Sequence, residues 1–355
     1  MLMIVMFHLI IHCKPAGNAS PFSLVYEVDK YINAACHVAV NCFALISGYV
    51  WFNARWSISK IVRCWSIGFF YSVVLNGIVF LLDGKIYTLK EDLLCLFPVF
   101  SGYQWYLTAY VFLFFCIPVL KVIVNSLSKK QLELFLTIIL LLTTVLPMLL
   151  RIDSFHLNFG YSPYWLCILF LVGNYVAKYD PYKNISSRKW LFSYLVFTTL
   201  TWGVGFLVEY VTNIAFGSVS WGDWLYNYSS FSVFIASFSL FMFFKQNLFS
   251  VRRTKILKKI SGATFGIYLI HTTKGIWKMS GDYLVPFSND SIFGYCLTLT
   301  LFTIGIFLVA AVIEILRESL FRKARINQLI SRIDSVRPIR IINETFNHEK
   351  LRRLN

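Results

Sequence analysis

Ten apolar stretches follow one another along this chain, separated by polar segments. Each is expected to form a helix, because strands of a membrane barrel alternate apolar and polar residues and these stretches do not. A helix that crosses a bilayer needs about 20 apolar residues, and Lys14 and Pro15 end the first stretch early. We therefore predict an all-α fold: a polytopic membrane helix bundle of about ten transmembrane helices, the first one truncated, over residues 1–13, 32–52, 64–82, 104–125, 132–150, 163–177, 190–212, 229–244, 261–279 and 292–315.

The composition excludes an ordinary soluble globule, because 57% of the residues are hydrophobic and only 14% are charged. The net charge of +16 would suit a nucleic-acid-binding protein if the basic residues were clustered on a soluble face. Here they lie between apolar stretches, so we expect membrane lipids and no nucleic acid as partners. The eight cysteines show no CxxC or Cys/His metal spacing, and we interpret them as small core residues.

The basic residues also predict the orientation of the chain, because cytoplasmic loops retain Lys and Arg. The segments after spans two, four, six and eight, together with the C-terminal tail, hold 26 of the 33. We expect an integral protein of a bacterial plasma membrane with both termini cytoplasmic. Residues 1–316 would form the transmembrane domain and residues 317–355 a basic cytoplasmic tail. The tail is weakly periodic and Pro338 interrupts it, so we expect it to be partly helical and to rest on anionic lipid.

Two histidines interrupt the first apolar stretch. His8 and His12 are four residues apart, which places both rings on one face of a helix. Ionisable groups are costly inside a membrane, so the pair is a candidate site, although a single buried histidine is more often a packing residue. The spacing also fits zinc, but no third ligand lies nearby in the sequence, and we expect no metal. A secretory signal peptide is the alternative for this stretch, but no cationic segment precedes it.

Three further signals are weak when taken singly. Lys60 and Arg63 share one face at the start of the third span, where they would either anchor the helix in the cytoplasm or bind the phosphates of a cofactor. Ser47 and Gly48 lie near the end of the second span, and a glycine there lets another backbone or a ligand approach closely. His271 lies in the ninth span, where a lone histidine would ordinarily be structural.

The order of these features along the chain resembles acyltransferase family 3, integral membrane enzymes that O-acetylate surface polysaccharides. The resemblance covers nearly all ten spans and rests on MIVMFH at 3–8, VNCFALISGYVWF at 40–52, KIVR at 60–63, WYL at 105–107 with Tyr110 and Pro118, and SGATFGIYLIH at 261–271. Lys60 stands where the family usually has arginine. The arginine that begins the family's first motif would fall eleven positions before His8, ahead of Met1. We therefore expect either a start further upstream or an N-terminally damaged copy.

The resemblance implies that acetyl-CoA, or a related acyl-CoA, is used from the cytoplasmic side. The acyl group would reach a hydroxyl of a cell-surface or lipid-linked glycan. A neutral imidazole with a pKa near 6.5 suits removal of a hydroxyl proton, so His8 would be the catalytic base, or it would carry the acyl group covalently. Lys60 and Arg63 would bind the CoA phosphates. Further residues that would line the site are His12, Ser47 and His271.

Two readings without acyl chemistry remain. A polysaccharide or lipid-linked sugar transporter would also be polytopic and basic inside, but transporters often contain two corresponding broken helices, and no such symmetry is found. A sensor or scaffold would leave the paired histidines and the paired bases unexplained.

Overall fold

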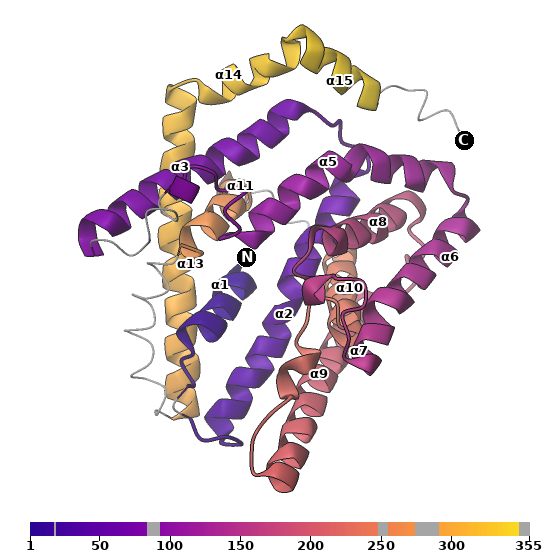
Figure 1. The fold of residues 1–355 in the computed structure, drawn as a ribbon, viewed down its shortest axis with the longest axis vertical. Helices are drawn as coiled ribbons and strands as arrows, with labels where there is room; N and C mark the ends of the chain where they lie inside the picture. The colour runs from indigo at the N-terminus through magenta and orange to yellow at the C-terminus, as the bar shows by residue number, and fades with distance from the viewer. Residues whose placement is uncertain (18, 84–92, 248–254, 274–290, 348–355) are drawn as a thin grey trace.

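The computed structural model describes residues 1–17, 19–83, 93–247, 255–273 and 291–347, and within them the chain is helical and contains no strand (Figure 1). The ends of the expected ninth span (274–279) and of the tail (348–355) lie outside the described residues, as do the bases Lys85, Lys90, Arg252 and Arg253. The helices are α1 (Leu2–His8), η1 (Leu9–Cys13), α2 (Leu24–Trp51), α3 (Ile58–Asp83), α5 (Trp105–Ser126), α6 (Lys129–Leu140), η2 (Leu141–Val145), α7 (Leu146–Leu150), η3 (Asn158–Gly160), α8 (Pro163–Tyr179), α9 (Ser187–Phe216), η4 (Gly222–Leu225), α10 (Phe231–Gln246), α11 (Lys255–His271), α13 (Ile292–Lys323), α14 (Ile326–Arg332), η6 (Ile333–Ser335) and α15 (Arg337–Asn347).

Among the described residues, six segments are long and apolar enough to cross a membrane: Leu24–Trp51, Ile58–Leu81, Trp105–Ser126, Lys129–Leu150, Ser187–Phe216 and Ile292–Lys323. The expected all-α membrane bundle is therefore confirmed, but the expected count of about ten spans is not. The remaining windows do contain apolar helices. These helices are shorter than the roughly 20 residues of a typical membrane span. Leu2–Cys13 ends at Lys14, and α8, α10 and α11 have 17, 16 and 17 residues.

Several helices begin where the sequence supplies a capping side chain. The Ser23 hydroxyl accepts a hydrogen bond from the backbone N–H of Tyr26 at the start of α2. Ser128 and Gln131 form a capping box at the start of α6. Such caps satisfy N–H groups that have no partner inside the helix, so they fix where each helix begins.

Helices α2 and α8 pack closely against each other, and glycines make this contact possible. A Cβ atom at Gly48 would lie 2.2 Å from the carbonyl oxygen of Phe170, and one at Gly173 would lie 2.2 Å from that of Leu45. The Asn174 side chain fixes the pair by donating a hydrogen bond of 2.9 Å to the Gly48 carbonyl. The expected close approach at Gly48 is confirmed, and the approaching group is the backbone of α8.

The short first helix lies inside the bundle. α1 continues as the π-helical turn η1, which ends at Lys14 in a left-handed conformation. It packs against α2 and α13, between which it is visible in Figure 1. Ile4, Val5 and Phe7 are buried in the core. His8, at the junction of α1 and η1, is thereby enclosed by protein.

The C-terminal part of the chain lies across one end of the bundle. α13 continues through Lys323, past the expected domain boundary at residue 316, and α14 and α15 then extend over α3 at the top of Figure 1. The helical path of the tail breaks at the extended Val336, just ahead of Pro338, so Pro338 lies at the start of a new helix and not inside one. It is the second residue of α15, where a proline is tolerated because its missing N–H would have no partner inside the helix.

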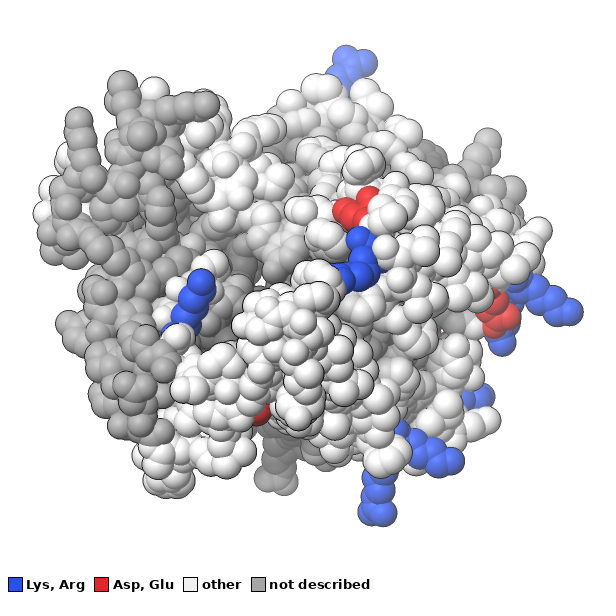
Figure 2. All heavy atoms as spheres, turned by 60° about the horizontal axis from the view of Figure 1, so that its bottom comes forward, with Lys and Arg blue, Asp and Glu red and all other residues white. Residues whose placement is uncertain are grey.

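The opposite end of the bundle is poor in charge. With the bottom of Figure 1 turned forward, the described surface is mainly uncharged and carries a few Lys and Arg side chains together with a few Asp and Glu side chains (Figure 2). Lys30 is one basic residue within α2 that is neutralised, since its ammonium lies 2.6 Å from a Glu209 oxygen and 2.7 Å from an Asp223 oxygen. This contact ties α2 to α9 and to η4.

Candidate active site

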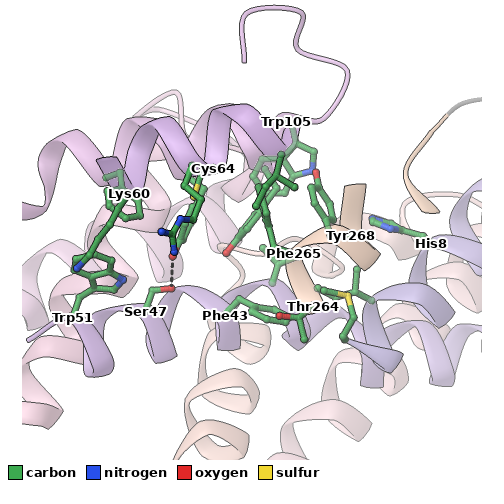
Figure 3. Close-up of a pocket in the computed structure, with 18 residues that line it drawn as sticks. His8, Phe43, Ser47, Trp51, Lys60, Cys64, Trp105, Thr264, Phe265 and Tyr268 are labelled. Atoms are coloured by element: carbon green, nitrogen blue, oxygen red, sulfur yellow. Dashed lines mark hydrogen bonds between the residues drawn. The ribbon is translucent and has the colours of Figure 1, made fainter. Parts of the chain in front are cut away.

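Five helices surround a cavity of about 460 Å³. Figure 3 shows Lys60 and Trp51 at one end, His8 at the other, and Ser47 and Phe43 between them. The residues that line it are, from α1 and its start, Met1, Ile4 and His8; from α2, Val40, Phe43, Ser47 and Trp51; from α3, Lys60, Arg63, Cys64 and Ile67; from α5, Trp105, Tyr106, Tyr110 and Phe114; and from α11, Thr264, Phe265 and Tyr268. The structure thus brings together segments that are far apart in the sequence.

His8 is buried and is hydrogen-bonded to a second histidine. Its Nδ1 lies 3.0 Å from Nε2 of His271, and Nδ1 of His271 lies 2.5 Å from the carbonyl oxygen of Ile267. A carbonyl only accepts, so Nδ1 of His271 carries the proton and Nε2 of a neutral His271 accepts from Nδ1–H of His8. In this arrangement the lone pair of a neutral His8 is on Nε2. That is the nitrogen that a general base or a nucleophile requires.

His12 lies beside this pair but outside the cavity lining. Its ring centroid is 5.6 Å from that of His8, so the two rings share one side of the helix as expected, although the turn between them is π-helical. His12 is exposed whereas His8 is buried. The structure therefore distinguishes two residues that the sequence presents as a pair.

Lys60 and Arg63 lie at the other end of the cavity without a carboxylate partner. Within the described residues neither forms an ion pair. The Lys60 ammonium lies 4.4 Å from the centroid of the Trp51 ring and donates a hydrogen bond of 2.5 Å to the carbonyl of Arg55. Arg63 is exposed. Two positive charges without an ion-pair partner among the described side chains are suited to an anionic group such as a phosphate.

Aromatic rings form the wall between these two ends. Tyr106 stacks on Tyr110 at 5.8 Å and meets Tyr268 edge-on at 5.7 Å. The hydroxyl of Ser47 lies 3.4 Å from that of Tyr110, which connects α2 to α5 (Figure 3). Such a wall leaves few polar partners for water along the cavity, so charges at its ends interact through a poorly screened medium.

A buried ion pair supports the α11 wall, and our sequence reasoning missed it. Arg317, expected to begin the basic tail, is instead buried in α13, where its guanidinium donates hydrogen bonds of 2.9 and 2.6 Å to the two oxygens of Glu314. Tyr71 of α3 donates a further bond of 2.6 Å to Glu314. Gly266 of α11 makes room for this carboxylate, because a Cβ there would lie 2.2 Å from Glu314 Cδ. The i, i+3 spacing of Glu314 and Arg317 was the available signal.

No group of three or more His, Cys, Asp or Glu side chains that could hold a metal ion is found in the described part of the chain. All eight cysteines are free thiols, and three of them, Cys13, Cys36 and Cys95, are buried. The titratable side chains that line the cavity are therefore one imidazole, one lysine ammonium, one arginine guanidinium, tyrosine phenols and the thiol of Cys64.

Comparison with known proteins identifies the family. A family model described as an acyltransferase domain matches residues 1–315, which is most of the chain and ends ahead of α14 and α15. Searches of curated proteins and of solved structures gave no match. The match includes every segment on which the resemblance rested, and the helices show a membrane protein. The chain belongs to acyltransferase family 3 and is a membrane acyltransferase.

Proposed function

We propose that this acyltransferase moves an acetyl or similar acyl group from cytoplasmic acyl-CoA, acetyl-CoA in the first place, to a hydroxyl of a cell-surface or lipid-linked glycan. The observation that carries the proposal is one cavity lined by Lys60 and Arg63 at one end and by buried His8 at the other. Phosphates of the donor would bind the bases, and its thioester would extend along the aromatic wall toward the imidazole. The bidentate fork of Arg63 suits a phosphate particularly well.

The reaction needs a proton acceptor near the thioester carbonyl. As the acceptor hydroxyl attacks that carbon, its proton passes to Nε2 of His8, the carbon–sulfur bond breaks, and CoA leaves as a thiolate that takes up a proton. Nδ1–H of His8 remains hydrogen-bonded to His271, so the imidazolium that forms keeps its orientation and a neutral acceptor. The alternative, attack by Nε2 itself to form an acyl-imidazole, uses the same lone pair.

The direction of transfer follows from the proposed orientation. The concentration of bases on alternate loops and the tail supports a cytoplasmic location for both termini in a bacterial plasma membrane. Lys60 and Arg63 would then face the compartment that supplies acyl-CoA. A sugar transporter is the less favoured alternative, because the family match supplies an acyl-transferring chemistry that a transporter does not need.

Two experiments test this proposal. Purified protein in nanodiscs should release free CoA from acetyl-CoA only when a glycan acceptor is added, and the acetyl group should appear as an ester on the glycan. Release of CoA that does not depend on any glycan, with no acetylated product, would refute the acceptor class.

Reporter fusions test the orientation. A fusion at Lys255 should be cytoplasmic and one at Asp223 external, and the reverse pattern would overturn the orientation.

A further inference from the structure

The tail is attached to the segment that leads into α3 by three polar side chains. Asn347 accepts a hydrogen bond of 3.0 Å from the N–H of Trp56 and donates one of 2.7 Å to its carbonyl. Asn343 accepts a hydrogen bond of 3.1 Å from the N–H of Ile58. Asp334 accepts one of 3.1 Å from the N–H of Ser59 and one of 2.5 Å from the Ser59 hydroxyl. These tail residues therefore bind backbone groups rather than side-chain charges.

These bonds cap α3 from outside its own chain segment. The first N–H groups of a helix have no partner within the helix, and here Ile58 and Ser59 find theirs in the tail. Asn343 also donates a hydrogen bond of 2.8 Å to Asp334, and this bond joins α15 to η6 in one network. The carboxylate of Asp334 lies at the positive end of the α3 dipole, which stabilises the cap further.

The same segment is held on its other side by α5. The indole N–H of Trp56 donates a hydrogen bond of 2.7 Å to the carbonyl of Phe114, and the Lys121 ammonium donates one of 3.0 Å to the carbonyl of Ala54. Trp56 is buried and meets the Phe346 ring edge-on at 5.2 Å. Residues 54–59 are thus clamped between α5, which lines the cavity, and α15.

Lys60 follows this clamped segment directly, and Arg63 lies one turn further along α3. Any fraying of the first turn of α3 would move both cations. Phe114 lines the cavity, and its carbonyl also accepts the hydrogen bond from Trp56. A residue of the cavity wall therefore holds the segment 54–59 in place.

We propose that residues 324–347 complete the acyl-CoA site of this chain by capping α3, and that Asp334, Asn343 and Asn347 are positioning residues for Lys60 and Arg63. This inference rests on the proposed use of acyl-CoA. The family match ends at residue 315, so these residues belong to a part of the chain that the family model does not include. The tail is then more than a basic segment on lipid: exposed Ile341 and Ile342 can rest on the membrane while the polar side chains bind α3.

The main test variant uses neutral substitutions, so that it changes no charge near Lys60. The double variant Asn343→Ala and Asn347→Ala removes two caps, and Glu344→Ala is the matched control, because Glu344 is exposed on the same helix and pairs only weakly, at 3.8 Å, with Arg340. Amide hydrogen exchange of Trp56 and Ile58, whose acceptors are removed, should accelerate about tenfold in the full-length double variant and stay unchanged in the control. KM for acetyl-CoA should rise about tenfold with kcat little changed.

The two readouts separate the outcomes. Unchanged exchange in the double variant would refute the cap. Faster exchange with an unchanged KM would refute the positioning role. If wild-type protein does not use acyl-CoA at all, the proposed function fails while the exchange measurement still decides whether the tail caps α3. Asp334→Asn, which keeps one acceptor oxygen near Ser59 but replaces the other by an amide NH2 and lacks the charge, should fall between wild type and the double variant in exchange rate.

Discussion

Nδ1 of His8 lies 3.0 Å from Nε2 of His271, although 263 residues separate the two in the sequence. The bond joins α1 to α11, and the carbonyl of Ile267 fixes the tautomer at its far end. A base oriented by a second group that is itself oriented is the arrangement found in many hydrolytic and transfer enzymes. Several consequences can be measured.

Replacing His271 should lower the rate of transfer without weakening donor binding. In His271→Phe the ring remains but the acceptor for His8 is lost, so we expect kcat to fall about 10- to 100-fold. KM for acyl-CoA should stay the same, because His271 is not part of the cavity lining. His271→Gln, which retains an acceptor oxygen, should recover part of the rate. A KM effect without a kcat effect would place His271 in donor binding instead.

Replacing His8 should abolish most of the transfer. Positioned general bases contribute about 10²- to 10⁴-fold, so His8→Gln should cost a hundredfold or more in kcat with normal protein level and membrane insertion. His12→Gln is the matched control, since its ring lies 5.6 Å away but outside the cavity lining. If both variants acetylate glycan at the wild-type rate, the catalytic assignment of His8 is wrong.

The sequence predicted these residues individually but not their arrangement. His8 and His271 were both noticed, yet nothing in either segment encodes a bond between helices 263 positions apart. The exposure of His12 was not predicted either. Two histidines at i and i+4 in an apolar helix look equivalent in the sequence, and only the packing of the neighbouring helices decides which of them is buried. Gly48 was different: a glycine at the end of a membrane helix directly indicates a close approach, and the α8 backbone is found there.

The tail shows the limit of sequence reasoning more clearly. Its basic residues suggested lipid, whereas its contacts with α3 are made by Asp334, Asn343 and Asn347. Bonds to backbone N–H groups leave no complementary side chain to recognise in the partner segment. The i, i+4 spacing of Asn343 and Asn347 was visible, but a pair of amides on one helix face does not identify what it binds.

Arg63 should be sensitive to a change that keeps its charge. Arg63→Lys retains a cation for anchoring α3 but loses the planar fork that binds a phosphate through two parallel bonds. We expect KM for acetyl-CoA to rise about tenfold, because charge-assisted bonds are each worth about 1.5 to 3 kcal/mol. Initial-rate measurements over a range of acetyl-CoA concentrations check this. Wild-type kinetics in Arg63→Lys would move the phosphate site elsewhere.

The α2–α8 contact predicts an overpacking effect. Gly48→Ala places a Cβ at 2.2 Å from the Phe170 carbonyl, so the helices must separate, and we expect a loss of about 1 to 3 kcal/mol in the free energy of unfolding. Gly203→Ala is the control, because a Cβ at Gly203 of α9 meets nothing within 4 Å. Thermal unfolding in detergent should show a lower Tm for Gly48→Ala alone. Equal Tm values for the two variants would contradict the close packing.

Asp334 predicts how docking of the tail depends on pH. Partial burial alone would raise the pKa of this carboxyl, but the hydrogen bonds that it accepts from Ser59 and Asn343 outweigh burial and lower its pKa below the usual value. A carboxyl whose pKa is lower in the folded state stabilises that state above its unfolded pKa, near 3.9, and loses this contribution as the pH falls through the folded pKa. Docking should therefore be constant between about pH 5 and 8 and weaken below about pH 4.

Pepsin, which is active in acid, can measure the docking of the tail as the rate of cleavage within residues 324–336. Cleavage should accelerate as the pH falls from 4 toward 2 in wild type, after correction for the pH dependence of pepsin on an unstructured peptide of the same sequence. In Asp334→Asn, which has no proton to gain at this position, cleavage should already be faster at pH 4 and should depend less on pH. An equal pH dependence in the two proteins would show that other carboxylates, and not the Asp334 cap on α3, hold the tail in place.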